Sequence, residues 1–138
     1  ELNISDHVAF LGQCDNAIVK KLYASAAVFV LPSVTAPNGD MEGQGLVLQE
    51  AQYCGVPVVS TLHNGIPDGV KDGETGYLVP EKDSCALAEA ICRIFQDSAM
   101  AAEMGSKGKS FVGSAYDTIR LAEQLKNWYS EIIASGVN

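Results

Sequence analysis

Apolar residues along the chain gather into four short continuous runs instead of alternating with polar residues. The runs cover residues 8–11, 27–31, 56–59 and 76–79. Continuous runs of this length are typical of strands buried on both faces, as in parallel sheets. Pro57 has no amide hydrogen, so we expect it at the start of its strand, where no ladder hydrogen bond is needed.

Between and after these runs, apolar residues recur at helical spacing. The predicted helices cover residues 15–25, 45–54, 84–96 and 117–133. Gly55 and Pro57 follow the second helix and end it, because Gly adopts the left-handed conformation and Pro cannot extend the hydrogen-bond ladder. Asp83 or Ser84 is a suitable N-cap for the third. Alternating strands and helices predict an α/β fold, a Rossmann-like parallel sheet with flanking helices.

The composition suits one packed domain of 138 residues, with 47% hydrophobic and 19% charged residues. No apolar run reaches the ~20 residues needed to span a bilayer. The net charge of −8 and the scattered Lys and Arg residues argue against nucleic acid, whose phosphates require a basic face. Residues 1–6 lack the basic start and apolar stretch of a signal peptide, so we expect a cytoplasmic location.

The cysteines show no metal-ligand spacing, and His7 and His63 add no metal constellation. The four are Cys14, Cys54, Cys85 and Cys92. We expect reduced, mostly buried thiols and no metal site. His63 follows a predicted strand, so it fits two roles, capping a loop or facing the cleft.

The densest chemistry lies between residues 32 and 50. A long loop with a turn signal at residues 37–40 ends in the segment from Glu42 to Gly45, directly before a predicted helix. Its glycines let the backbone approach a ligand, and the free amides of the first helical turn favour an anion such as phosphate. Glu42 could accept hydrogen bonds from sugar hydroxyls. Glu50, about two turns further at ~1.5 Å per residue, could reach those of a ribose. Both glutamates also fit a structural role, Glu42 beside the helix dipole and Glu50 on a solvated helix face.

The segment from Glu42 to Glu50, with the Cys-Gly-Val-Pro-Val-Val that begins at Cys54, resembles the family-four, or group 1, glycosyltransferases of the GT-B fold. Their signature is two glutamates separated by seven residues, followed by such a segment. Further blocks resemble the family in the same order, at residues 8–12, 22–33, 64–68 and 72–80. The resemblance therefore covers nearly the whole chain.

The resemblance implies a donor site for a nucleotide-diphosphate sugar. Glu42 would contact hydroxyls of the donor hexose, Glu50 those of the ribose, and the intervening amides the sugar and diphosphate. The residues implied in donor binding are Glu42, Gly43, Gln44, Gly45, Leu46, Glu50 and, near the base, Gly12. The family transfers a hexosyl unit with retention to a glycan or lipid-linked acceptor, generally without a protein-held metal or another cofactor. No carboxylate in this segment is expected to be a covalent nucleophile, so stabilising the leaving diphosphate would be the main catalytic work.

Three positions depart from the family pattern. Position 44 is Gln where an aromatic residue is common, position 64 is Asn where Gly is frequent, and position 68 is Asp where Glu is usual. Two other functions are alternatives to a transferase. A nucleotide-sugar epimerase of related fold would lack this order of motifs, whereas a non-enzymatic nucleotide-binding module would keep Glu50 and the amides.

The resemblance further implies that residues 1–138 form a truncated C-terminal nucleotide-sugar-binding domain. In the family, an Arg and a Lys that hold the diphosphate lie upstream, and so does an N-terminal acceptor domain, which would make any contact with the inner membrane. We therefore expect the chain alone to bind nucleotide weakly and to transfer no sugar. An open sheet edge or apolar surface would favour self-association. Polysaccharide or glycolipid biosynthesis is the expected setting.

Overall fold

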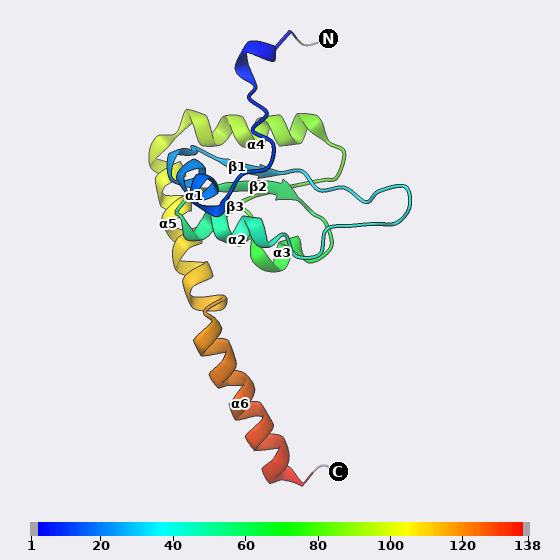
Figure 1. Ribbon diagram of the computed structural model, residues 1–138, viewed down its shortest axis with the longest axis vertical. Helices are drawn as coiled ribbons and strands as arrows, with labels where there is room; N and C mark the ends of the chain where they lie inside the picture. Colours follow the sequence, from blue (N-terminus) through cyan, green and yellow to red (C-terminus); the bar gives the residue numbers. More distant parts are fainter. Residues whose placement is uncertain (1–2, 137–138) are drawn as a thin grey trace.

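The computed structural model describes residues 3–136 and forms an α/β fold around a parallel sheet with strand order β1-β2-β3 (Figure 1). The strands are β1 (Phe29–Leu31), β2 (Val58–Thr61) and β3 (Gly76–Val79). The helices are α1 (Asn16–Ser25), α2 (Leu46–Tyr53), α3 (Ile66–Gly69), α4 (Ser84–Gln96), α5 (Ser98–Ala115) and α6 (Thr118–Ser135), preceded by a 3-10 turn at Ser5–His7. The predicted Rossmann-like sheet with flanking helices is confirmed.

The sheet is covered on both faces, which explains why its strands have continuous apolar sequences. All four residues of β2 are buried. Val58 belongs to a core shared with α2 and α3, which includes Leu48 and Ile66. The next residue, Val59, points to the opposite face and packs in a second core with residues of α4 and α5 such as Ile94. Neighbouring residues of one strand thus anchor two helical layers.

The predicted helix boundaries match closely where a local signal marks them. Helix α4 begins at Ser84 because the Asp83 side chain accepts a hydrogen bond from the Ala86 amide at 2.9 Å. Gly55, with φ of 82°, ends the α2 segment in the left-handed conformation. Pro57 lies directly before β2, and its carbonyl accepts from the Phe29 amide across the strand pair.

Helices α3 and α5 were not predicted. Helix α5 contains three glycines, which weaken any helical pattern, but one of them permits close packing. A Cβ atom at Gly105 would collide with the carbonyl oxygen of Gly55, so only glycine lets α5 approach the end of α2 this closely. Helix α3 contains Pro67 and ends at Gly69, both of which indicate a loop when the sequence is considered alone.

The predicted strand at residues 8–11 is wrong in this structure. These residues form no strand, and the Phe10 side chain is 95% exposed. A strand needs a neighbour for its backbone groups, yet among the described residues the sheet ends at β1, whose outer edge pairs with nothing. The expectation of mostly buried cysteines is also wrong, because Cys54, Cys85 and Cys92 are exposed and Cys14 is partly exposed.

Helix α6 projects away from the body of the molecule, and the N-terminal segment leaves it at the opposite end (Figure 1). No α6 residue is buried. The aromatic side chains of Trp128 and Tyr129 are both exposed. None of the helices within residues 3–136 has the length and apolar character to cross a membrane.

Candidate donor site

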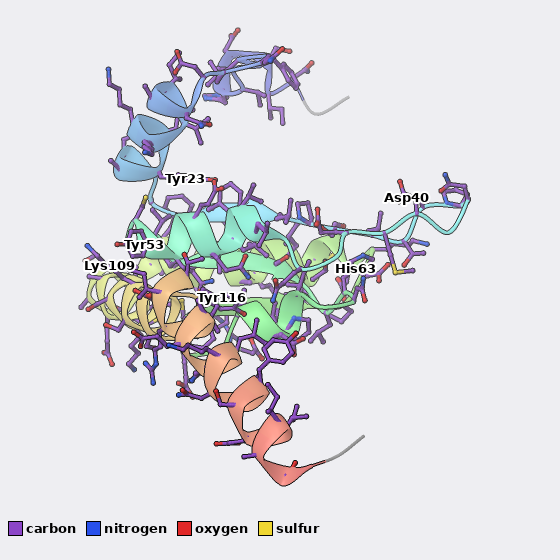
Figure 2. The ribbon with its side chains drawn as sticks, turned by 60° about the horizontal axis from the view of Figure 1, so that its bottom comes forward. Tyr23, Asp40, Tyr53, His63, Lys109 and Tyr116 are labelled. Atoms are coloured by element: carbon purple, nitrogen blue, oxygen red, sulfur yellow. The ribbon has the colours of Figure 1, made fainter. Side chains whose placement is uncertain are left out.

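The predicted ligand loop and helix start lie at the carboxyl end of β1. Residues 32–45 contain no helix or strand, and the loop reaches outward to Asp40 (Figure 2). Gly45 is the N-cap of α2 with φ of 64°, and as a glycine it has no side chain of its own to cap the helix. In parallel sheets, ligands bind at the carboxyl ends of the strands, and helix N-termini there favour anions. The backbone thus has the form that the sequence predicts for an anion site.

Glu42 closes this helix start in the structure. Its Oε1 atom accepts hydrogen bonds from the amides of Gly43 at 3.1 Å and Gly45 at 3.3 Å. A carboxylate therefore lies against two of the four amides that the sequence assigns to a ligand. A phosphate or sugar oxygen that used these amides would have to displace Glu42, which would leave its carboxylate available for a hydroxyl group.

Gln44 turns toward the start of α6. Its Nε2 donates to the phenolic oxygen of Tyr116 at 3.4 Å, and that hydroxyl donates to the carbonyl of Asp68 at 3.0 Å. Burial, followed by the charge of Asp68, raises the pKa of the Tyr116 phenol. Two of the positions that depart from the family pattern, 44 and 68, are thus joined through Tyr116, which sequence reasoning missed.

Glu50 lies on the exposed side of α2, between two grooves. One groove of about 550 Å³ runs between α2 and the α5–α6 junction, and a second of about 240 Å³ runs between α1 and α2. The Tyr23 hydroxyl donates to Glu50 Oε2 at 3.3 Å, and burial, followed by the nearby Glu50 charge, raises the pKa of Tyr23. Glu50 is therefore oriented by a tyrosine that sequence reasoning did not assign to the site.

Gly12 adopts a left-handed φ of 64° in the exposed segment before α1. None of the hydrogen bonds described for residues 3–136 joins it to the loop of residues 42–46. The structure thus places Glu42, Gly43, Gln44, Gly45 and Leu46 at one helix start, with Glu50 further along the same helix, whereas no described hydrogen bond joins Gly12 to them. Within the described part of the chain, no group of three or more His, Cys, Asp or Glu residues is arranged to hold a metal ion.

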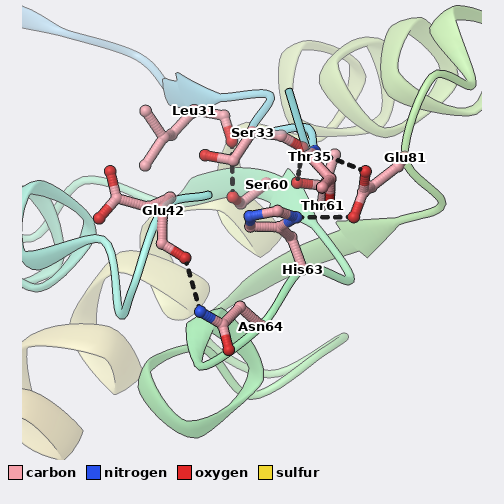
Figure 3. Close-up of polar contacts among 9 residues, drawn as sticks. All are labelled: Leu31, Ser33, Thr35, Glu42, Ser60, Thr61, His63, Asn64 and Glu81. Atoms are coloured by element: carbon pink, nitrogen blue, oxygen red, sulfur yellow. Dashed lines mark hydrogen bonds and ion pairs between the residues drawn. The ribbon is translucent and has the colours of Figure 1, made fainter. Parts of the chain in front are cut away.

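Polar residues from the neighbouring loops hold the ligand loop in place (Figure 3). The Asn64 side chain donates to the Glu42 carbonyl at 2.9 Å, and the Gly65 amide donates to the Gly43 carbonyl at 3.0 Å. Asn64 itself has a φ of 44°, a conformation that Asn tolerates better than most residues. This explains why Asn can replace the family's Gly at this position.

A parallel sheet between two helical layers, with a glycine-capped helix start at its carboxyl edge, defines a Rossmann-like α/β protein. Comparison with known sequences narrows this class. The family described as "Glycosyl transferases group 1" matches residues 1–111. The chain belongs to this family of glycosyltransferases.

Two relatives illustrate the match. The chain is 45% identical over 96 residues to WcaL of Escherichia coli (strain K12), a glycosyltransferase assigned to colanic acid biosynthesis, covering 70% of this chain and 24% of WcaL. It is 31% identical over 137 residues to N-acetyl-alpha-D-glucosaminyl L-malate synthase of Bacillus anthracis, covering 99% of this chain and 34% of the relative. The chain thus spans between a quarter and about a third of the length of these relatives.

Solved structures agree. The sucrose-phosphate synthase from Thermosynechococcus elongatus superposes with a TM-score of 0.81 and 36% identity, over 97% of this chain and 32% of that structure. Anabaena HepE, solved in complex with UDP-glucose, gives a TM-score of 0.80 and 27% identity, over 94% of this chain and 34% of HepE. The architecture of the chain therefore corresponds to one part of larger glycosyltransferase structures.

Proposed function

We propose that this chain supplies the donor site of a retaining glycosyltransferase, which transfers a hexosyl unit from a nucleotide-diphosphate sugar to a glycan or lipid-linked acceptor. The observation that carries the proposal is the start of α2, where Gly45 adopts the left-handed conformation and the amides of Gly43 and Gly45 point at a carboxylate, that of Glu42. One acidic residue, Glu42, lies before this point, and a second, Glu50, lies on the same helix beyond it. The two carboxylates thus flank a helix start suited to an anion.

The proposed chemistry follows from charge development. When the glycosidic bond to the nucleotide breaks, negative charge accumulates on the leaving diphosphate. The backbone amides of the first α2 turn and the positive end of the helix dipole favour this charge. The backbone already holds these amides in place, so only the Glu42 side chain has to move when a donor binds. This part of the chain would therefore stabilise the leaving group and would not act as a nucleophile.

Glu42 would exchange partners on donor binding. It now accepts from the amides of Gly43 and Gly45. A donor that takes over these amides would free the Glu42 carboxylate to accept hydrogen bonds from hexose hydroxyls. A charged carboxylate accepts such bonds more strongly than a neutral group does. Glu50, already held by the Tyr23 hydroxyl, would accept from the ribose. The complex of HepE with UDP-glucose supports a nucleotide sugar as the donor class.

The rest of the enzyme would complete the site and cover the exposed apolar face of α6. The exposed apolar residues of α6 are Ile119, Leu121, Leu125, Trp128, Tyr129, Ile132 and Ile133. The relatives are about three times as long as this chain, so further structure is available to pack against this helix. We propose that an acceptor-binding domain is this partner, and that the chain alone binds nucleotide but transfers no sugar.

Calorimetric titration of the chain with UDP, GDP and ADP tests the donor site, with Glu50→Ala as the test variant. We expect one nucleotide to bind and Glu50→Ala to weaken it at least about tenfold, because a hydrogen bond to a charged group contributes ~1.5–3 kcal/mol. The matching nucleoside, which lacks the diphosphate, should bind more weakly to both proteins.

Glu89→Ala is the matched control, because it removes an exposed carboxylate from α4, on the other face of the sheet. It should bind the nucleotide as the unaltered chain does. If no nucleotide binds, the donor-site proposal is wrong for this chain. If Glu50→Ala binds as tightly as Glu89→Ala, Glu50 does not contact the ribose.

A further inference from the structure

One buried histidine joins the three loops that follow the three strands. His63 lies in the loop after β2 and is only 2% exposed. Its Nδ1 atom lies 2.6 Å from Oε1 of Glu81, in the turn after β3. The other Glu81 oxygen, Oε2, accepts from the Thr35 amide, in the loop after β1, at 2.9 Å (Figure 3). A single carboxylate therefore ties the ligand loop to both neighbouring loops.

The ligand loop is held along its whole base by the chain segment around His63. At its β1 end, Ser60 Oγ donates to the Leu31 carbonyl and Thr61 Oγ1 to the Ser33 carbonyl, both at 2.6 Å. At its α2 end, Asn64 and Gly65 donate to the carbonyls just before Gly45. The contact between Glu81 and Thr35 lies between these two ends. Without it, none of the described hydrogen bonds would join residues 34–41 to another part of the chain.

The position of the proton decides which group donates in the contact between His63 and Glu81. The hydrogen bond from His63, followed by that from the Thr35 amide, holds the pKa of the Glu81 carboxyl below its ordinary value. An ionised carboxylate only accepts hydrogen bonds, so His63 must carry a proton on Nδ1. The nearby charge of Lys82 acts in the same direction. The His63 Nε2 atom is buried and has no hydrogen-bond partner in the described part of the chain.

A buried nitrogen without a partner costs stability. A packing residue at this place would avoid that cost, so the histidine needs another reason to be there. Within residues 3–136, the ring makes one polar contact, and this contact orients Glu81 toward the ligand loop. Through Glu81, the ring influences the loop that ends in Glu42 and the Gly43 and Gly45 amides.

We infer that His63 and Glu81 are positioning residues, which hold the loop of residues 32–45 so that Glu42 and the adjacent amides face the donor hexose. The loop-holding part stands on the contacts above, and the role toward the hexose rests on the proposed function. The pair acts on loop order and touches neither nucleotide nor sugar. Its loss should therefore affect the sugar part of a donor more than the nucleotide part.

Amide hydrogen exchange of the 138-residue chain tests loop order without any ligand. His63→Ala and Glu81→Gln should each raise exchange at Thr35 and across residues 33–43 about tenfold or more, as expected for loss of a hydrogen bond to a charged group. Amides of β2 should stay protected, which shows that the variants fold. Glu103→Gln is the matched control, because it breaks an exposed Lys107–Glu103 ion pair of the same 2.6 Å length on α5.

The pH dependence is a readout that simple packing would not change. Glu81 has a lowered pKa in the folded chain, so its contribution is present above the ordinary carboxyl pKa and is lost as pH falls through the folded value. Protection of the Thr35 amide, corrected for intrinsic exchange, should therefore fall at acidic pH. In Glu81→Gln this dependence should disappear, whereas in Glu103→Gln it should persist.

Titration with UDP, GDP and ADP and with UDP-glucose, GDP-mannose and ADP-glucose tests the functional part. For the base that binds, the nucleotide sugar is compared with the nucleotide alone. The hexose should add less affinity in His63→Ala than in the unaltered chain, whereas the affinity for the nucleotide should change little.

Unchanged amide exchange of the loop in both variants would overturn the inference, whichever ligand binds. Increased exchange with an unchanged hexose gain would leave only a structural tie and reject positioning. If neither nucleotides nor nucleotide sugars bind the unaltered chain, the proposed function fails and positioning toward a hexose is rejected with it, whereas loop holding is still decided by exchange.

Discussion

The body of the molecule and helix α6 are built from similar sequence patterns but reach opposite outcomes. Helix α4 carries an apolar stripe and buries Ala90 and Ile94 against the sheet. Helix α6 has an apolar stripe of its own and buries nothing among the described residues. An amphipathic pattern thus specifies a helix and its apolar face, but the surface that covers this face must come from another segment. The chain spans only part of its relatives' length, which fits a face whose partner lies outside residues 3–136.

The largest effect should come from one substitution made in each region. Leu48 is fully buried in the core between α2 and the sheet, whereas Leu125 on α6 is 49% exposed. Leu48→Ala should lower the free energy of unfolding by ~2–5 kcal/mol, because it removes buried methylene groups and leaves a cavity. Leu125→Ala should change it by less than ~0.5 kcal/mol, since exposed positions contribute little.

Urea denaturation of both variants measures this difference. Equal destabilisation by the two substitutions would contradict the comparison, because it would mean that α6 packs in solution as firmly as α2 does. The slope of the transition should stay the same in both variants, since neither changes how much surface unfolding exposes.

A smaller effect should separate two glycines of α5. At Gly105 an added Cβ would collide with the Gly55 carbonyl, whereas at Gly113 it would meet nothing within 4 Å. Gly105→Ala should therefore destabilise the chain by ~1–3 kcal/mol through overpacking against a backbone that cannot easily move. Gly113→Ala should stabilise α5 by up to ~1 kcal/mol, because Ala is the better helix former.

Thermal unfolding of the two alanine variants measures this difference. The midpoint should fall in Gly105→Ala and rise in Gly113→Ala. A midpoint that rises in both would show that α5 does not approach α2 as closely as described. The body of the molecule would then be less tightly packed than its buried strands suggest.

The same contrast explains what could be predicted from the sequence. Helix α4 was predicted with its observed bounds, because its cap and stripe are local. The start of α2 was predicted because glycine before a helix is also a local signal. Residues 8–11 look like a strand but form none, since a strand is completed only by its neighbours. Local patterns therefore predicted the elements but not their pairing.

Long-range contacts explain what was missed at the site. Glu81 lies 18 residues from His63, and Tyr23 lies 27 residues from Glu50. No spacing rule connects such pairs, because the fold alone brings them together. The available signal was weaker: a histidine directly after a buried strand, where sequence reasoning left loop capping and a cleft position both open. The structure shows that His63 ties loops together from a buried position.

The smallest effect on stability should accompany the largest effect on association. Replacing Trp128 and Ile132 of α6 with Ser should leave the free energy of unfolding nearly unchanged, because both side chains are exposed.

We expect the unaltered chain to self-associate, since contiguous exposed apolar surface and an unpaired strand edge favour contacts between copies. Light scattering at high concentration should then report a lower average mass for the Ser variant. A matched change on the polar face, Glu123 and Glu131 to Ser, should leave the average mass unchanged. If the unaltered chain is a uniform monomer, exposure of α6 is tolerated. If the average mass falls as much in the polar-face variant as in the Trp128 and Ile132 variant, association depends on charge and the apolar face is not its cause.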